Sequence, residues 1–412
     1  MTGSEKGTVF APESAAQVAE AVAWAAAAGE PLEVVGRGSK RALGRPVQAG
    51  HGLDLARLDG ITLYEPEELV LSARAGTPLA AIEAALDEQR QMLAFEPPDL
   101  GPLLGGAAGA GSLGGVLACN LAGPRRVKAG AARDHFLGVT AVSGRGETFK
   151  SGGRVVKNVT GYDLCKLLAG AYGTLAVMTD VAVKVLPRPE KTYTVLLFGL
   201  DDAAAGEAMR QALGSPHEVS GAAHLPAAQA AKSAVAYVAG AGGAVTALRV
   251  EGPGPSVEYR CAALRRELAD LGPTDELHSQ NSIAFWRELR DVRSFAGDQR
   301  TAVWRLSVAP TAGPSVVTGI GEGEAFYDWG GGLIWLSLPL NGANDAGAAQ
   351  VRAAVAAAGG GHATLIRAPL ELRAAVPVFQ PQDAATAALT RRVKEGFDPR
   401  GILNPGHMVA GL

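Results

Sequence analysis

The chain has 412 residues, 47% of them hydrophobic, which at roughly 100 to 200 residues per domain suggests two or three domains with sizeable cores. Its 38 basic and 41 acidic residues leave a net charge of −3, so no overall field attracts nucleic acid or an anionic membrane. Cys119, Cys165 and Cys261 lack the spacing of a disulfide framework, an iron-sulfur cluster or a structural zinc site. We therefore expect a soluble cytoplasmic protein.

Neither the N-terminus nor the longest uncharged run predicts a membrane segment. Glu5, Glu13 and Glu20 stand where a signal peptide would be basic and then apolar, so we expect no export. Residues 103–123 carry no charge and are long enough to span a bilayer, but seven of these 21 residues are glycine. This run is better explained by a folded glycine-rich loop.

The first third of the chain alternates helix and strand signals. Ser14 begins a capping box, which predicts a helix over 14–28 stopped by Gly29. Strands are expected over 31–35 and 69–75, followed by a helix that Thr77 caps and Pro78 begins. These elements predict an α+β domain in small layers.

A new domain should begin after the proline pair at 187–189. Strand and helix patterns recur beyond it and suggest an antiparallel sheet with helices on one face. Residues 227–245 are rich enough in alanine and glycine to form a mobile loop. The expected strands are 192–198, 303–308, 333–338 and 363–367, and the expected helices are 201–213, 257–268 and 346–357.

Three glycine-rich segments stand out. Residues 34–40, VVGRGSK, end a strand in a turn whose successive N–H groups could point at one phosphate. An ordinary glycine hairpin explains this first segment equally well. The second, residues 109–123, follows Pro97-Pro98-Asp99, and the third runs from Gly161-Tyr162-Asp163 into a valine-rich strand after Gly173.

The second segment contains a match to G-x-G-x-x-G at 109–114, with Asp134 placed 20 residues beyond it. A dinucleotide-binding Rossmann motif must follow a buried strand, yet residues 97–108 are rich in proline and glycine and show no β-branched run. We therefore do not predict a Rossmann fold.

The order of these segments resembles the FAD-binding domain of the vanillyl-alcohol oxidase family, also called the PCMH-type fold. Residues 397–406, FDPRGILNPG, look like the segment with which such chains return to the flavin. Residues 285–290, FWRELR, and 303–308, VWRLSV, look like those of the smaller FAD-binding subunits of bacterial glycolate oxidases.

This resemblance implies an α+β fold with three parts. A PCMH-type FAD-binding domain of two α/β subdomains would cover 1–189. A cap domain with an antiparallel sheet and helices, forming a substrate or interface region, would cover 190–380. Residues 381–412 would return to the FAD domain.

The resemblance also implies the cofactor residues. Pro97 and Pro98 would sit beside the isoalloxazine, Gly173 near the adenine, and Asn404 would position the ring system. The FAD should be non-covalent, because the loops present Arg37 and Ser112 where some relatives have a tethering His or Cys. The full expected set is Val35, Gly36, Arg37, Gly38, Ser39, Lys40, Pro97, Pro98, Gly111, Ser112, Leu113, Gly114, Gly115, Asn120, Gly123, Arg133, Asp134, Gly161, Tyr162, Asp163, Gly173, Val177 and Asn404.

One region is strongly basic. It could neutralise FAD phosphates, receive an acidic substrate or dock a partner, although a charge run is usually a solvated face. Of its members only Arg133 is expected near the cofactor. The region contains Arg125, Arg126, Lys128, Arg133, Arg145, Lys150, Arg154 and Lys157, against Asp134 and Glu147.

Arginines are the candidates for binding substrate, since a guanidinium grips a carboxylate with two hydrogen bonds. We single out Arg287, Arg290 and Arg305, while noting that each could simply support an interface. The seven histidines are too scattered for a metal pair, and the metal-binding segment of related 2-hydroxy-acid dehydrogenases is missing. No metal site is predicted.

The resemblance implies an FAD-binding subunit of a complex that oxidises glycolate to glyoxylate. Its partners would be a larger FAD-binding glycolate oxidase subunit and an iron-sulfur subunit. These partners could attach the chain to the inner face of the membrane. The oxidation could occur on this chain or on the larger subunit. Two alternatives stay open: a self-sufficient FAD-dependent 2-hydroxy-acid dehydrogenase of the D-lactate type, and a scaffold subunit whose flavin does no chemistry.

Overall fold

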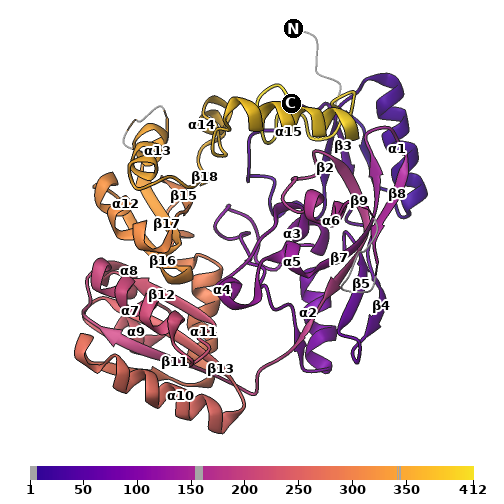
Figure 1. Cartoon of the computed structure of the whole chain (residues 1–412). Helices are drawn as coiled ribbons and strands as arrows, with labels where there is room; N and C mark the ends of the chain where they lie inside the picture. Colours follow the sequence, from indigo (N-terminus) through magenta and orange to yellow (C-terminus); the bar gives the residue numbers. More distant parts are fainter. Residues whose placement is uncertain (1–6, 154–160, 341, 343–344) are drawn as a thin grey trace.

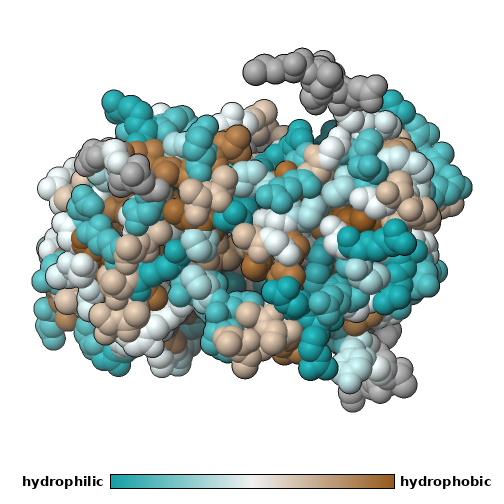
Figure 2. Space-filling model, turned by 90° about the horizontal axis from the view of Figure 1, so that it is seen from above, coloured by the Kyte–Doolittle hydropathy of each residue, from teal (hydrophilic) through white to brown (hydrophobic). Residues whose placement is uncertain are grey.

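The computed structural model describes residues 7–153, 161–340, 342 and 345–412. Two halves stand side by side in Figure 1, a purple half with the N-terminal strands and a pink-to-orange half built on one large sheet. The yellow C-terminal helices return from the second half over the first. Figure 2, which views the molecule from that side, shows small apolar patches among hydrophilic residues and no continuous apolar face there.

A small parallel sheet in the order β1–β3–β2 opens the purple half. Helix α1 buries Val18 and Val22 against it. The helix begins as predicted, since the Ser14 hydroxyl accepts the Gln17 N–H at 3.3 Å, and it ends at Gly29, whose φ of 73° favours glycine. The bounds are β1 (Val9–Phe10), α1 (Ala15–Ala28), β2 (Leu32–Val35) and β3 (His51–Asp54).

A five-stranded antiparallel sheet in the order β4–β5–β9–β7–β8 forms the second layer. Short helices share a core with one of its faces, whereas Val142 and Val177 point into the core with α1. The bounds are β4 (Ile61–Glu65), β5 (Val70–Arg74), α2 (Leu79–Glu88), β6 (Gln91–Met92), α3 (Leu113–Cys119), α4 (Arg126–Ala129), α5 (Ala132–His135), β7 (Phe136–Ser143), β8 (Thr148–Gly152), α6 (Leu164–Leu168), β9 (Ala176–Lys184) and β10 (Leu186–Pro187).

Two details of this half correct or confirm the sequence analysis. Thr77 does not cap a helix: its hydroxyl donates to the Arg74 carbonyl at 2.7 Å and accepts the Gly60 N–H at 3.0 Å, and α2 begins later, after Pro78. The tight turn before the helix therefore holds this side chain. No strand lies between Met92 and Leu113 in the described chain, as expected for a loop that is not a Rossmann motif.

The second half is an eight-stranded antiparallel sheet in the order β14–β11–β13–β12–β16–β17–β15–β18, which we call the cap sheet. Its bounds, with those of its helices, are β11 (Lys191–Phe198), α7 (Asp202–Gly214), β12 (Gly221–Leu225), α8 (Ala227–Ala230), α9 (Ala236–Ala239), β13 (Val245–Gly252), α10 (Gly254–Glu267), β14 (Thr274–Leu277), α11 (Ser279–Arg290), β15 (Thr301–Ser307), α12 (Gly313–Ile320), β16 (Glu324–Asp328), β17 (Leu333–Pro339), α13 (Ala348–Ala357) and β18 (His362–Arg367).

Helices cover both faces of the cap sheet, so the prediction of helices on one face was wrong. The outer face packs against α7, α10, α12 and α13, whereas the inner face packs against α11 and against Leu100 and Leu103 of the purple half. Adjacent residues of a strand point to opposite faces of the sheet, and Leu196 and Leu197 are both fully buried. Both faces of the cap sheet are therefore covered and apolar.

Residues 227–245 form two short helices, α8 and α9, before β13 begins at Val245. They were predicted to form one mobile loop. Ala230, Val235 and Val238 are buried in the inner-face core. The small apolar residues of this stretch therefore contribute to packing.

The chain returns to the purple half through α14 (Leu370–Ala375) and α15 (Ala384–Phe397). Beyond α15, Leu403 forms a parallel bridge with Leu32 of β2, and both residues are fully buried. We propose that the domain limits follow these connections, with boundaries after residues 189 and 380.

Candidate functional site

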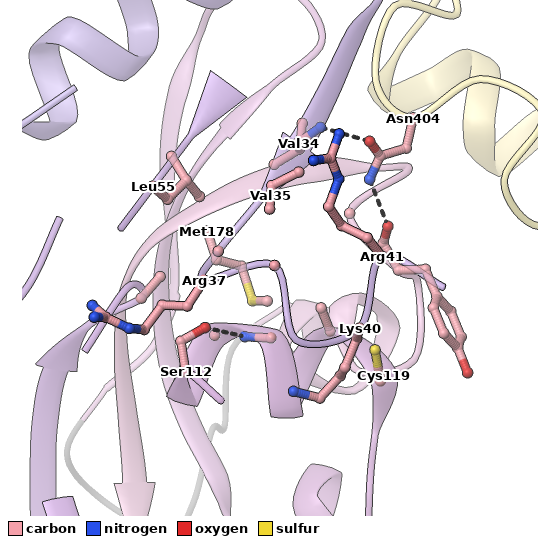
Figure 3. Close-up of a pocket in the computed structure, with 18 of the residues that line it drawn as sticks. Val34, Val35, Arg37, Lys40, Arg41, Leu55, Ser112, Cys119, Met178 and Asn404 are labelled. Carbon is pink, nitrogen blue, oxygen red and sulfur yellow. Dashed lines mark hydrogen bonds between the residues drawn. The ribbon is translucent and has the colours of Figure 1, made fainter. Parts of the chain in front are cut away.

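An open pocket lies where three segments of the purple half meet the C-terminal segment (Figure 3), and the space inside it, its open mouth included, is about 830 Å³. The loop after β2 forms one wall, α3 another, residues 172–178 a third, and the C-terminal segment closes it. Eleven predicted cofactor residues gather here: Val35, Gly36, Arg37, Gly38, Ser39, Lys40, Ser112, Gly114, Gly115, Gly173 and Asn404.

Glycines let these segments approach one another closely. A Cβ added at Gly36 would lie 2.6 Å from the Ser112 Oγ, and one at Gly114 would lie 2.7 Å from Ala75. Gly173 has a φ of 69°, and a Cβ there would lie 2.9 Å from the Asn404 Nδ2. The pocket walls are therefore backbone at these points. The Gly114 N–H is already bonded to the Ala75 carbonyl at 2.9 Å, and the Gly115 N–H to the Ser112 hydroxyl at 3.3 Å, so α3 contributes close approach more than donors.

A half-buried cation lies at one side of the pocket. Figure 3 shows Lys40 and Cys119 near each other, on the opposite side from Asn404. Burial lowers the pKa of Lys40, while Cys119 and Asp99 partly offset this effect. Burial also raises the pKa of the Cys119 thiol to about 11, which keeps it protonated and a poor nucleophile at neutral pH. Lys40 is thus placed to meet an anionic ligand group.

Asn404 ties two pocket walls together. The Val34 N–H donates to its Oδ1 at 2.7 Å, and its Nδ2 donates to the Tyr172 carbonyl at 2.9 Å. Asn404 adopts a φ of 44°, which asparagine tolerates better than most residues. Its side chain fixes the position of the first glycine loop relative to residues 172–173.

A buried ion pair that the sequence analysis missed supports Asn404. The Lys394 ammonium donates to the Thr174 carbonyl at 2.7 Å, to Asp398 at 2.6 Å and to the Leu403 carbonyl at 3.0 Å. Asp398 in turn accepts the Leu403 N–H at 2.8 Å. The four-residue spacing of Lys394 and Asp398 at the end of a helix was the available signal.

Tyr172 was also missed, although it directly precedes Gly173. It lines the pocket, and its ring centroid lies 4.9 Å from that of Phe379 and 5.8 Å from that of His407. Its φ is 52°, which is strained for a bulky residue. This loop therefore holds an aromatic ring at the pocket against its backbone preference.

Twelve predicted cofactor residues do not line this pocket. Leu113 and Val177 are core residues, Arg133 and Asp134 are exposed, and Gly123 lies against the second half. Asp163 caps α6 by accepting the Lys166 N–H at 3.3 Å, as the capped-helix interpretation expected. The complete set is Pro97, Pro98, Gly111, Leu113, Asn120, Gly123, Arg133, Asp134, Gly161, Tyr162, Asp163 and Val177.

The three candidate substrate arginines lie in two places. Arg287 and Arg290 line a second pocket between the halves, where Arg290 pairs with Asp291 at 2.8 Å. Arg305 lies on β15, and its guanidinium carbon is 5.0 Å from the centroid of the Trp329 ring. Burial lowers the pKa of Arg305 to about 10, and the neighbouring Tyr172 partly offsets this shift. Only Arg305 approaches the wall of the first pocket.

The basic region does not act as one charged face. Arg125 is paired, Lys128 contacts Glu218 at 3.2 Å, and the Arg145 guanidinium donates to the Gly396 carbonyl at 3.1 Å. Arg154 and Lys157 lie outside the described residues. The described members therefore have separate surroundings and separate roles.

Four charged side chains join the halves in what we call the interface cluster, Glu96, Arg125, Arg249 and Glu251. Arg249 donates to both Glu96 oxygens at 2.8 and 3.0 Å, and Arg125 donates to both Glu251 oxygens at 2.9 and 2.8 Å. Burial alone would raise the pKa of Glu96, but Arg249 and Arg125 outweigh it and lower that pKa. The cluster neutralises itself.

Known proteins are similar to this chain in sequence and in fold. The description "FAD binding domain" matches residues 7–152, and "FAD linked oxidases, C-terminal domain" matches residues 379–408. "Glycolate oxidase subunit GlcE" of Escherichia coli (strain K12) is 36% identical over 383 residues, covering 93% of each chain. "Glycolate oxidase subunit GlcD" of Bacillus subtilis (strain 168) is 31% identical over 161 residues, covering 39% of this chain and 33% of its own.

A solved structure of p-cresol methylhydroxylase with substrate bound superimposes with a TM-score of 0.73 at 14% identity, covering 99% of this chain and 90% of that one. The pocket fits FAD, because glycine backbone and Lys40 suit phosphates while Val35, Leu55 and Met178 suit apolar rings. The fold and sequence therefore define an FAD-dependent oxidoreductase with the PCMH-type fold.

Within that class, the chain belongs to the family of FAD-linked oxidases that includes the glycolate oxidase subunit GlcE. This confirms the family and the cofactor expected from the glycine-rich segments. In the part of the chain that the structure describes, no helix is long and apolar enough to cross a membrane.

Proposed function

We propose that this chain is the FAD-binding subunit of a complex that oxidises glycolate, a small 2-hydroxy acid, to glyoxylate. The observation that carries the proposal is its 36% identity to a glycolate oxidase subunit over 93% of both chains. Such a subunit requires partners, and a larger FAD-binding subunit and an iron-sulfur subunit are the ones proposed. Peripheral contact with the inner face of the membrane would then come through them.

Bound FAD would supply an electron acceptor, either for the hydride that leaves the α-carbon of the acid or, if the oxidation occurs on the larger subunit, for electrons from that subunit. The chain's residues bind and orient that group. Backbone N–H groups of the first glycine loop and the Lys40 ammonium would hold the phosphates, and the Ser39 hydroxyl, which accepts from Lys40 at 3.1 Å, would add a further donor. Asn404 and Tyr172 hold the opposite end of the pocket in place. The FAD is proposed to be non-covalent, since Arg37 and Ser112 line the pocket at the positions where some relatives have a tethering His or Cys.

One observation favours a second candidate, a self-sufficient 2-hydroxy-acid dehydrogenase. Arg305 lies close enough to Tyr172, in the pocket wall, for the two groups to affect each other's pKa. A cation beside a flavin pocket is what a chain with its own substrate site requires.

The test is an anaerobic flavin spectrum of the purified chain, alone and with its larger partner. Acid denaturation should release the flavin into solution if it is non-covalent. We expect glycolate to leave the isolated chain's flavin oxidised, with bleaching near 450 nm, the usual flavin band, only after the partner is added. Bleaching without the partner would favour the self-sufficient enzyme, and a chain that binds no flavin would refute both.

A further inference from the structure

Two arginines from different halves each lie against the same indole ring. The guanidinium carbon of Arg126, on α4 of the purple half, lies 4.5 Å from the Trp329 ring centroid, and that of Arg305, on β15 of the cap sheet, lies 5.0 Å from it. These distances are within the range of cation–π contacts, so the indole stabilises both cations. We call these three residues the arginine pair site.

The protein fixes Trp329 firmly between the halves. Its indole N–H donates to the Gly123 carbonyl at 3.1 Å, and its backbone N–H donates to Asp328 at 2.7 Å. Trp329 has a φ of 52°, matching the strained φ of Tyr172. Strain of this kind is concentrated at functional sites. One strained aromatic residue, Trp329, therefore belongs to the arginine pair site, and a second, Tyr172, lines the flavin pocket.

The two cations lack an acidic partner within the described chain. Neither guanidinium forms an ion pair within 4.0 Å or a side-chain hydrogen bond there. The acids that influence them are Asp134, which partly offsets the burial that lowers the pKa of Arg126, and Asp328, which does the same for Arg305. Burial raises the pKa of Asp328 to about 7, so it supplies only part of a negative charge at neutral pH.

The arginine pair site lies close to the flavin pocket. Arg305 alternates along β15 with Trp304, which packs on the outer face, so Arg305 faces the purple half. Tyr172 links the two sites, because it lines the flavin pocket and also packs against the inner-face core that contains Trp329. A small molecule on the arginines would therefore lie next to the Tyr172 side of the flavin pocket.

We propose that Arg126 and Arg305 bind the carboxylate of a small 2-hydroxy or 2-oxo acid beside the flavin, an inference that rests on the proposed function. Two guanidiniums offer planar pairs of N–H donors that match a carboxylate. The bound anion would supply the negative charge that no acidic side chain of the described residues supplies in an ion pair. This binding site belongs to this chain whether or not the oxidation occurs on it.

The test is an anaerobic titration of the FAD-loaded chain with oxalate, which has carboxylates but no hydrogen on carbon to lose. We expect a saturable change in the flavin spectrum and a higher unfolding temperature. Arg126→Met and Arg305→Met should each weaken oxalate binding by roughly tenfold or more, and Arg305→Lys by less than Arg305→Met. Arg300→Met, at an exposed arginine, is the matched control and should bind like the wild type.

Flavin content is measured separately for each variant, which shows that it has folded and tests the proposed function independently. A wild-type chain that holds FAD but ignores oxalate would overturn the site and leave the cofactor assignment intact. Oxalate binding unchanged in both methionine variants would also overturn it. So would an equal response to sulfate at the same ionic strength, because the site would then recognise charge without preferring a carboxylate.

Discussion

Arg125 and Arg126 are adjacent in sequence and have opposite surroundings. Arg125 belongs to the interface cluster, where two glutamates satisfy it, whereas Arg126 lies over Trp329 with no ion-pair partner within 4.0 Å in the described chain. A protein that supplies both signs of charge gains a fixed contact between its halves. A protein that buries cations without anions loses some stability, but it gains affinity for an anionic ligand.

The largest expected effect comes from making the same substitution at both positions. Arg125→Met leaves Glu96 and Glu251 short of a buried cation, so the free energy of unfolding should fall by about 3–5 kcal/mol. Arg126→Met removes a desolvated cation that repels Arg305, so the change should stay within about 1 kcal/mol. Urea denaturation of the flavin-loaded variants measures both. An equal decrease in the free energy of unfolding would mean that the two arginines stabilise the fold to the same extent.

Asp328 lies within electrostatic reach of both regions, and its pKa of about 7 gives a pH signature. The folded state keeps this proton after the unfolded state, with an ordinary pKa near 3.9, has lost it. Stability from this group should therefore fall as pH rises from about 4 to 7, then level off.

Replacing Asp328 with Asn should remove that dependence. Relative to the wild type, Asp328→Asn should gain roughly 2 kcal/mol more stability at pH 8 than at pH 5. Parallel urea curves at the two pH values supply the measurement. A difference that is independent of pH would show that the carboxyl does not titrate in this range.

The interface cluster should show the opposite behaviour in acid. Arg249 and Arg125 hold the pKa of Glu96 below its ordinary value despite burial. The cluster's contribution is therefore complete above the unfolded pKa, about 4.3, and is lost as pH falls through the lower folded value. Below pH 4 the wild type should lose up to about 1.4 kcal/mol per pH unit from this group, a slope that Glu96→Gln should reduce. An unchanged slope would assign the acid sensitivity elsewhere.

Arg133 provides the smallest expected effect. It is exposed, and although it was predicted to lie near the cofactor, it does not line the pocket. Arg133→Ala should change stability by less than about 0.5 kcal/mol and leave the flavin content unaltered. A clear loss of FAD in this variant would support the prediction that Arg133 lies near the cofactor.

Local signals in the sequence predicted local structure well. Ser14 and Gly29 mark the ends of α1 because a cap and a left-handed turn depend on neighbouring residues alone. Thr77 carries a similar cap signal, but its hydroxyl bonds to Gly60, which a tertiary turn places beside it. Such a contact is invisible to a rule based on spacing.

The pocket was predictable through resemblance, whereas of the arginine pair site only Arg305 was singled out from the sequence. The glycine loops and Asn404 stand at positions that a family motif marks. Arg126, Arg305 and Trp329 come from separate elements, and no periodicity or spacing links them. Nor could sequence distinguish Arg125 from Arg126, because the partners of Arg125 include Glu251, which is 126 residues away.

The Asn404 bridge has a consequence for biosynthesis. Its bond to Val34 spans 370 residues, and its bond to Tyr172 spans 232. The first glycine loop leaves the ribosome early, but it lacks this brace until residue 404 has been made and has emerged. The pocket therefore cannot be complete until Asn404 has emerged, well after the cap sheet, and we expect stable loading of the cofactor to follow translation of the cap sheet.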